Sequence, residues 1–371
     1  MSQCGTLLFF LSLAILSCAG PDHGSEIRIG FYGPLTGNMA SFGQTTKKGV
    51  DLAVAEANKT GTGPKIKLFS EDDRGNPEEA QSAVTKLITK YRVIAILGEP
   101  SSSGSLAGAP VCQRNGIPMI TPTATNPKVT EVGDFIFRVC WIDPFQGEIM
   151  ARFAVTRLGA KRLAVLFDVT SDYSTGLAEV FENTVRQLGG EVIKKASYSV
   201  GDTDFSAQLT AIREFTPDAI FVPGYYNEAG LIVRQARKMG IGAIILGGDG
   251  WDSPALQQVA RESLDRAYYC THFFPADPDA QPFVKLFQKQ YGEIPSMGGA
   301  LGYDAANLLL QAIRSTANPQ PLQIRDAVAN IRDFKGVTGS IRFDSRRNAV
   351  KPAIILRLDR GKTSFAERIN P

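Results

Sequence analysis

Short runs of apolar residues alternate along the chain with longer stretches in which apolar positions recur at helical spacing. The short runs end at glycines or turn residues, which is typical of strands buried in a parallel sheet. The segment 44–59 shows the second pattern, because Val50, Ala53, Val54 and Ala57 form one apolar face. Strands that alternate with amphipathic helices predict an α/β fold with doubly wound parallel sheets.

The two patterns also place the individual elements. Strands are expected at residues 26–32, 65–70, 93–97, 117–120, 135–140, 162–167, 191–197, 218–222, 243–246 and 266–270. Helices are expected at residues 44–59, 77–91, 144–158, 176–188, 206–215, 229–239, 280–291, 299–315 and 322–331, with one more after the loop at Ser101–Ser103. Near the end of the chain, residues 339–344 and 352–359 are predicted to form a terminal strand pair.

One strand–loop–helix–strand unit occurs twice. Residues 93–125 and residues 219–250 share the order strand, loop, helix, Gly-Ile, strand, loop, at nearly the same spacing. This repeat predicts two similar Rossmann-like lobes. The remainder of the chain starts no third lobe, so we expect three crossings between the lobes, an arrangement that permits a hinge. The expected division is 1–25 for a signal peptide and spacer, 26–143 plus 274–335 for lobe 1, and 144–273 plus 336–371 for lobe 2.

Hydroxyl-rich loops follow two strands of the first unit. Ser101–Ser103 lie where a strand hands over to a helix, whose free N–H groups and positive dipole end favour an anion. Thr123 and Thr125 follow the neighbouring strand, and open α/β sheets bind ligands at this edge. If the two lobes face each other, Asp249 of the second unit opposes these hydroxyls, which suits a zwitterion such as an amino acid.

Simpler interpretations of these residues remain open. Ser101–Ser103 could be a helix N-cap with spare polar residues, and Asp249 could cap the helix near Ser253. Tyr173 and Tyr225 could be half-buried aromatic residues without a ligand role. The repeat favours the binding interpretation, because it places matching loops at equivalent edges of two lobes.

Composition narrows the function. The chain has 371 residues, 43% of them hydrophobic, so it can build large cores. Its 40 basic and 37 acidic residues form no long runs, which argues against a nucleic-acid partner. Only two histidines, His23 and His272, make a His-based metal site or His-dependent catalysis improbable. The sequence also shows no Cys/His pair, nucleophile elbow or phosphate loop, so we expect neither an enzyme nor a cofactor.

The N-terminus predicts export. Its apolar run of about ten residues is too short for a membrane span and ends in small residues, as in a secretory signal peptide. Ile15-Leu16-Ser17-Cys18 resembles a bacterial lipobox, in which Cys18 would carry the lipid. No Lys or Arg precedes the apolar run, and plain cleavage after Cys18 or Ala19 is the alternative.

Three cysteines remain after the leader, an odd number for an oxidising compartment. Cys112 falls on a helix position that we expect to be buried. Cys140 and Cys270 end two segments that cross between the lobes, so they could be neighbours. Two buried thiols are favoured over a disulfide between them.

From about Ile27 to its C-terminus the chain resembles the bacterial branched-chain amino-acid binding proteins, which are type I periplasmic solute-binding proteins of ABC transporters. The motifs that carry the resemblance are GPLTG at Gly33–Gly37, the Ser-rich loop after ILG, TPTATNP at Thr121–Pro127, DYSTG at Asp172–Gly176, DFSAQL at Asp204–Leu209, GYYNEAGLIVRQARKMG at Gly224–Gly240 and GSIRFD at Gly339–Asp344. Each motif alone is weak, but all of them occur in order.

The resemblance implies roles for individual residues. Ser102 and Thr125 would bind a ligand carboxylate, completed by groups at Pro100, Ser101 and Thr123, while Asp249 would receive the ammonium. Tyr173, Tyr225 and Phe42 would be the aromatic contacts. The chain departs from the family because Ser101 replaces one cysteine of a disulfide found in some members, and because Asp249 stands where the family often has glutamate. The identity of the ligand therefore cannot be carried over from the family.

The resemblance also implies a function. We expect the substrate-binding component of an ABC importer, a monomer in the periplasm or at the cell surface, whose lobes close on an amino acid or small carboxylate for a membrane permease. The alternative is a sensor of the same fold that reports an amide or amino acid to a receptor. Export without a fused signalling domain favours transport.

Overall fold

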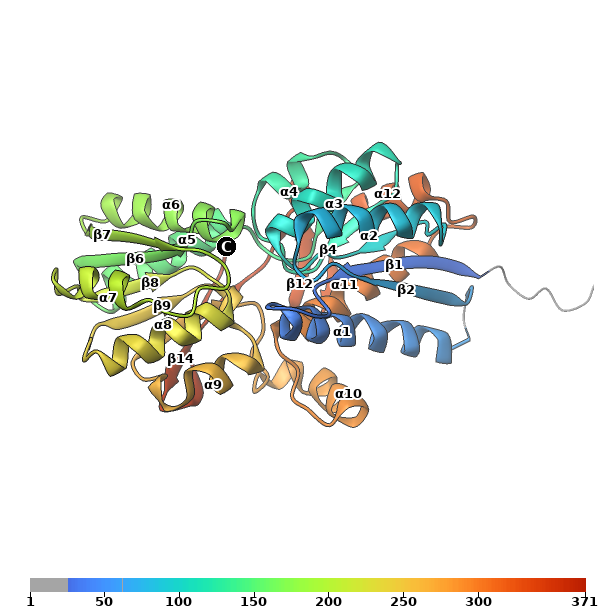
Figure 1. Ribbon diagram of the computed structural model, residues 1–371. Coiled ribbons are helices and arrows are strands. Elements are labelled where there is room, and N and C mark those ends of the chain that lie inside the picture. Colours follow the sequence, from blue (N-terminus) through green and yellow to red (C-terminus); the bar gives the residue numbers. More distant parts are fainter. Residues whose placement is uncertain (1–25, 62) are drawn as a thin grey trace, which may run out of the picture.

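The computed structural model describes residues 26–61 and 63–371, which form two α/β lobes side by side (Figure 1). The predicted signal peptide and the predicted lipidation site Cys18 lie outside the described residues. The first lobe contains a parallel sheet with the strand order β2-β1-β3-β4-β5. Its strands are β1 (Ile27–Gly33), β2 (Ile66–Asp72), β3 (Ile96–Leu97), β4 (Met119–Thr121) and β5 (Ile136–Arg138).

The second lobe contains a seven-stranded sheet with the order β15-β14-β10-β9-β8-β6-β7. The strands from β10 to β7 are parallel, whereas β14 and β15 are antiparallel to their neighbours. The parallel strands are β6 (Arg162–Asp168), β7 (Glu191–Tyr198), β8 (Ala219–Val222), β9 (Ile244–Gly247) and β10 (Ala267–Thr271). All four residues of β8 are buried, as expected for a strand covered on both faces. The predicted α/β fold with two Rossmann-like lobes is confirmed.

The end of the chain differs from its prediction. The strands β12 (Gly339–Phe343) and β14 (Ala353–Asp359) do not pair with each other. Instead β12 lies between β11 (Phe334–Gly336) and β13 (Ala349–Val350), and β14 pairs with β10 and with β15 (Lys362–Ile369). The terminal strand pair was wrong because strand partners distant in sequence leave no local signal.

The helices cover both sheets, and polar caps fix where several of them begin. Asn76 accepts hydrogen bonds from the N–H groups of Glu78 and Glu79, and Pro77 is the first residue of α2. Ser101 caps α3. The longer helices are α1 (Ala40–Lys59), α2 (Pro77–Thr89), α3 (Ser102–Arg114), α5 (Asp143–Arg152), α6 (Asp172–Gln187), α7 (Ser206–Arg213), α8 (Tyr226–Lys238), α10 (Gln281–Tyr291), α11 (Met297–Arg314) and α12 (Pro321–Ala329). The short ones are α4 (Lys128–Glu131) and α9 (Pro254–Ala260), and a π-helical turn at Phe153–Arg157 extends α5.

The chain passes between the two lobes three times: after β5, after β10, and between β13 of the small β11-β12-β13 sheet and β14. The predicted division into lobes stays a prediction. The predicted division assigns residues 337–350 to lobe 2, but this segment contacts first-lobe residues. Asp304 accepts from the N–H groups at 337 and 338, and Arg347 donates to the carbonyls of Thr130 and Ile136. These contacts favour a last crossing near Lys351 over one after residue 335.

The three cysteines of the described part are free and buried, so the favoured expectation of unbonded thiols at Cys140 and Cys270 is confirmed. Cys112 lies buried in α3, as predicted. None of the helices formed by residues 26–61 and 63–371 has the length and apolar character that a membrane crossing requires.

Candidate ligand-binding site

The first wall of the candidate site is the edge of the first sheet where β3 and β4 end. Hydrogen bonds join its two hydroxyl-rich loops: Thr123 donates to the carbonyl of Pro100 at 2.6 Å, and the N–H of Asn126 donates to Ser102 Oγ at 3.2 Å. Ser102 and Thr125 are both about 1% exposed. Thus Ser102, Thr123 and Thr125 lie together beside the first turn of α3, where free N–H groups favour an anion.

Glu99 stabilises this wall through hydrogen bonds. Its Oε2 accepts hydrogen bonds from the N–H of Ser101, at 2.6 Å, and from the Ser101 hydroxyl. Its carbonyl accepts from the hydroxyls of Ser105 and Thr121. Burial, and then the nearby Asp73, raise the pKa of Glu99 well above its usual value. The Ser101 hydroxyl is therefore engaged within the lobe, as the cap of α3 and as a partner of Glu99, which weakens its predicted role as a ligand contact.

The second wall comes from the loops after β6, β8 and β9. The rings of Tyr173 and Tyr225 lie 5.2 Å apart, and Tyr225 also contacts Phe42 of the first lobe at 5.7 Å, edge to face. The hydroxyl of Tyr173 donates to Gln146 Oε1 and accepts from the N–H of Gly250, both at 3.2 Å. Phe42 and Tyr173 are 2% exposed. All three predicted aromatic residues thus meet at the boundary between the lobes.

Direct hydrogen bonds join the edges of the two lobes. Ser103 Oγ donates to Asp172 Oδ2 at 2.8 Å, and Asn126 Nδ2 donates to the carbonyl of Asp172 at 2.9 Å. On the other side of the aromatic residues, Asn38 Nδ2 donates to Glu228 Oε1 at 2.6 Å. The expectation that the matching edges of the two lobes face each other agrees with these contacts.

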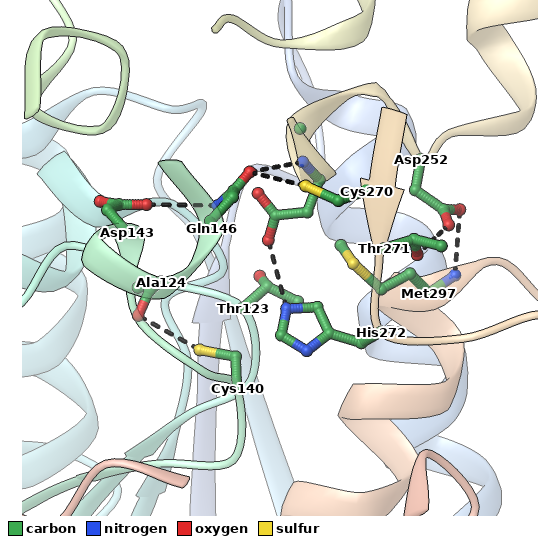
Figure 2. Close-up of polar contacts among 12 residues, drawn as sticks. Thr123, Ala124, Cys140, Asp143, Gln146, Asp252, Cys270, Thr271, His272 and Met297 are labelled. Carbon is green, nitrogen blue, oxygen red and sulfur yellow. Dashed lines mark hydrogen bonds and ion pairs between the residues drawn. The ribbon is translucent and has the colours of Figure 1, made fainter. Parts of the chain in front are cut away.

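Asp249 follows β9 and is 2% exposed. Two of its polar neighbours, Gln146 and His272, are labelled in Figure 2. Its N–H donates to Gln146 Oε1 at 2.8 Å, and its Oδ2 lies 3.4 Å from His272 Nε2. Burial, and then the nearby Asp143, raise the pKa of Asp249 to about 8, and burial raises that of Asp143 to about 7. Burial, and then Lys351, hold the pKa of His272 well below its usual value. The imidazole is therefore neutral and supplies no positive charge to the two acids.

The site therefore combines hydroxyls at a helix N-terminus on one lobe with buried acids and aromatic rings on the other. A sequence profile of the family described as periplasmic binding protein matches residues 26–363. The chain belongs to the periplasmic binding protein family. Its members bind solutes and are not enzymes, so the prediction of a non-enzymatic protein is confirmed.

Three relatives specify the subfamily. A leucine-binding protein, LivK, of Thermotoga maritima is 40% identical, with a TM-score of 0.89 over 93% of this chain and 99% of that one. LivJ of Streptococcus pneumoniae, solved with isoleucine, is 35% identical, with a TM-score of 0.89 over 94% and 100% of the two chains. The Leu/Ile/Val-binding protein homolog 2 of Brucella abortus is 29% identical over 94% of this chain and 95% of its own length. The resemblance to branched-chain amino-acid binding proteins is thereby confirmed.

The sequence analysis did not single out three residues that lie at the candidate site of this periplasmic binding protein: Trp141, Gln146 and His272. Trp141 and His272 lie at two crossings, one residue after Cys140 and two after Cys270. Their rings stack with centroids 3.7 Å apart. The signal that could have found these two is a polar or aromatic residue just after a predicted strand that leads to a crossing between the lobes. Among the residues described, no group of three or more His, Cys, Asp or Glu side chains is placed to hold a metal ion.

Proposed function

We propose that this periplasmic binding protein is the extracytoplasmic substrate-binding component of an ABC importer, and that it captures an amino acid between its two lobes. The observation that carries the proposal is the opposition of two walls. Ser102, Thr123 and Thr125 line the first, and the buried acid Asp249 lies in the second, where the lobes are hydrogen-bonded to each other.

Each end of an amino acid has a suitable partner. The carboxylate would accept hydrogen bonds from Ser102, Thr125 and the free N–H groups at the start of α3. The ammonium would pair with Asp249, whose raised pKa reflects a buried acid without a cation beside it. Tyr173, Tyr225 and Phe42 would cover the carbon skeleton. Pro100 has no N–H to donate, so in this proposal its carbonyl positions Thr123 beside the carboxylate through their hydrogen bond.

The relatives support the same ligand class, since LivK is a leucine-binding protein and LivJ was solved with isoleucine. Family membership supports export and delivery to a membrane permease. In this proposal the N-terminal segment is a signal peptide, Cys18 is its lipidation site, and the exported protein acts as a monomer. Contacts such as Ser103–Asp172 would form when the hinge closes on the ligand.

Calorimetric titration tests the proposal. The protein, freed of copurified ligand, is titrated with amino acids and with the matching acids that lack the amino group. We expect Asp249→Ala to weaken amino-acid binding by about 100-fold, because an ammonium would be buried without its acid. Binding of the acids without an amino group should change by no more than a few-fold.

Asp204→Ala is the control, because Asp204 is an exposed acid of the same lobe. It accepts a hydrogen bond from the N–H of Ser206, the first residue of α7, and hydrogen bonding to Ser206 lowers its pKa. It should leave both affinities unchanged. Equal losses for both ligand classes in Asp249→Ala would remove Asp249 from the ammonium role. Absence of binding for every amino acid and carboxylate would overturn the proposed function.

A further inference from the structure

Buried polar atoms without a hydrogen-bond partner gather beside Asp249. Within residues 26–61 and 63–371 there are eleven such side-chain atoms, and five of them belong to four neighbouring residues. They are Trp141 Nε1, Asp143 Oδ2, Asp249 Oδ2 and both ring nitrogens of His272. We call these four residues the crossing cluster, because three of them lie at the crossings between the lobes.

The members of the crossing cluster are close together and buried. His272 stacks on Trp141 with the ring planes 19° apart, and its Nε2 lies 3.4 Å from Asp249 Oδ2. All four residues are at most 2% exposed. Figure 2 shows the side chain of Thr123, from the first wall, pointing toward the same space as the imidazole of His272. The N–H of Asp143 also donates to the carbonyl of Thr125 at 3.0 Å, so the cluster adjoins the first wall.

Unpaired polar atoms of this kind are costly. A buried donor or acceptor without a partner destabilises a protein because it has lost its hydrogen bonds to water, and native proteins keep few of them. Binding sites are where convergent polar groups of this kind occur, because the ligand supplies the partners. Five such atoms on four neighbouring buried residues are therefore better explained by polar partners that a ligand supplies than by five separate packing defects.

The proposed ammonium accounts for only part of the cluster. It would pair with Asp249 Oδ2 and Asp143 Oδ2, which are acceptors. Trp141 Nε1 then still needs an acceptor. The neutral His272 can donate from Nε2 to Asp249 Oδ2, which lies 3.4 Å away, so its Nδ1 still needs a donor. A branched aliphatic side chain offers neither. An acidic side chain would be repelled by Asp143 and Asp249, and a basic one would supply donors only.

We propose that the ligand is an amino acid with a neutral side chain that both donates and accepts hydrogen bonds, a carboxamide above all, and that Trp141 and His272 select that group. This inference rests on the proposed function and names the ligand class for the same site. It sets this protein apart from LivK, a leucine-binding protein, and from LivJ, which was solved with isoleucine. Trp141 and His272 are specificity-determining residues in this proposal, whereas Asp249 serves every amino acid alike.

Competitive calorimetry with four amino acids tests the inference. Asparagine and glutamine are compared with leucine and isoleucine on the full protein. We expect the better of the two carboxamides to bind at least tenfold more tightly than either aliphatic amino acid. His272→Phe keeps an aromatic ring on Trp141 but removes both nitrogens. It should weaken carboxamide binding by about tenfold or more and leave leucine binding unchanged or stronger.

His272→Gln is the matched variant, because its amide retains one donor group and one acceptor. It should restore most of the preference for the carboxamide ligand, which a merely structural role of His272 would not predict. Tighter binding of leucine or isoleucine to the wild-type protein would overturn the inference and leave the proposed function intact. Equal weakening of both ligand classes by His272→Phe would also overturn it. Failure of all four amino acids to bind would overturn both proposals.

Discussion

At the scale of single residues, the position of Asp249 is set by the two glycines that flank it. A Cβ atom on Gly248 would lie 2.2 Å from the Tyr173 hydroxyl, and one on Gly250 would lie 2.7 Å from the carbonyl oxygen of Gly224. A side chain at Gly250 would collide with that backbone carbonyl, and one at Gly248 would displace the Tyr173 hydroxyl, so glycine at both positions lets the backbone approach the tyrosine and place the carboxyl group inward. The acid is buried as a consequence, and its pKa rises to about 8.

The raised pKa of Asp249 predicts that amino-acid affinity increases with pH. An ammonium stabilises the ionised acid, so binding near neutral pH releases the proton that Asp249 carries without ligand. Affinity should therefore rise by up to about tenfold per pH unit between pH 6.5 and pH 8, then level off above the pKa. Titration calorimetry across this range, in buffers of different ionisation enthalpy, measures both the affinity and the proton released.

Two variants locate the proton in that experiment. Asp249→Asn should bind weakly and lose most of the pH dependence, whereas Asp143→Asn should keep it. An unchanged slope in Asp249→Asn would show that Asp249 is already ionised without ligand. Loss of the slope in Asp143→Asn alone would place the proton on Asp143 instead.

The sequence could predict those residues of the candidate site that lie in its repeated unit or in its family motifs. Ser102, Thr125 and Asp249 follow strands at matching places in the two units, and the structure brings them to facing walls. His272 and Trp141 follow strands too, but they lie where the chain leaves a lobe. A single histidine in an apolar segment carries no sign of what it will face. Only the packing of two crossings against each other brings these rings together.

At the scale of elements, two helix N-termini from different lobes meet at one acid. Asp172 is the first residue of α6, and Ser103 lies in the first turn of α3. Ser103 Oγ donates to Asp172 Oδ2 at 2.8 Å and accepts from its N–H at 3.2 Å. A carboxylate near two helix N-termini is favoured by both dipoles. This contact stabilises the arrangement in which the two lobes touch.

Loss of the Ser103–Asp172 contact should weaken ligand binding without touching the ligand. Ser103→Ala removes both hydrogen bonds, worth about 0.5–1.5 kcal/mol each, and so favours separated lobes. We expect amino-acid affinity to fall by about 3- to 30-fold, with the melting temperature of the ligand-free protein nearly unchanged. Calorimetry measures the affinity, and small-angle X-ray scattering should show a less compact ligand-free protein.

Ser82→Ala is the control for that variant, because Ser82 is exposed on α2 and its hydroxyl bonds only to the carbonyl of Glu78. It should leave affinity and shape unchanged. If Ser103→Ala binds as tightly as the wild type, the contact does not contribute to closure.

The elements themselves were predictable where the signal is local. Buried runs of Val, Ile and Leu gave the parallel strands to within a few residues, and Asn76-Pro77 marked the start of α2. Besides the terminal strand pair, one strand was predicted too long and one was not predicted at all. The strand expected at 93–97 is ordered as a strand only at Ile96–Leu97, and β15 was not foreseen because its residues are mostly exposed. Antiparallel partners such as β14 and β15 depend on tertiary packing, which overrides local preference.

At the scale of the whole molecule, the two lobes bury several acids whose pKa is raised chiefly by burial. Burial raises the pKa of Asp73 to about 7, that of Asp143 to about 7 and that of Asp249 to about 8, and it raises that of Glu99 well above its usual value. Asp249 and Asp143 lie in the site between the lobes, whereas Glu99 and Asp73 lie beneath the Ser-rich loop. The free energy of unfolding is therefore lower than it would be with apolar residues at these positions. The destabilisation arises at the candidate site and beneath the Ser-rich loop.

These acids predict that the ligand-free protein becomes less stable as pH rises from 6.5 to 8. Each carboxyl has a folded-state pKa above its unfolded value of about 4, so the stabilisation present below pH 4 is lost as pH rises through the folded pKa. His272 has a lowered pKa and acts in the opposite direction, but only below about pH 6.5, where the unfolded histidine takes up a proton. Lys351, with a pKa lowered to about 8, affects stability only above that pH.

Between pH 6.5 and pH 8 the acids therefore act alone among these groups. Thermal unfolding should show the melting temperature falling by several degrees, at about 2–4 °C per kcal/mol for lobes of this size. Asp249→Asn removes one acid and should reduce the slope, and a bound amino acid should reduce it in the wild type by holding Asp249 ionised. A melting temperature that stays level or rises over this range would mean that the buried acids are ionised and paired. The argument for an ammonium at Asp249 would then lose its electrostatic basis.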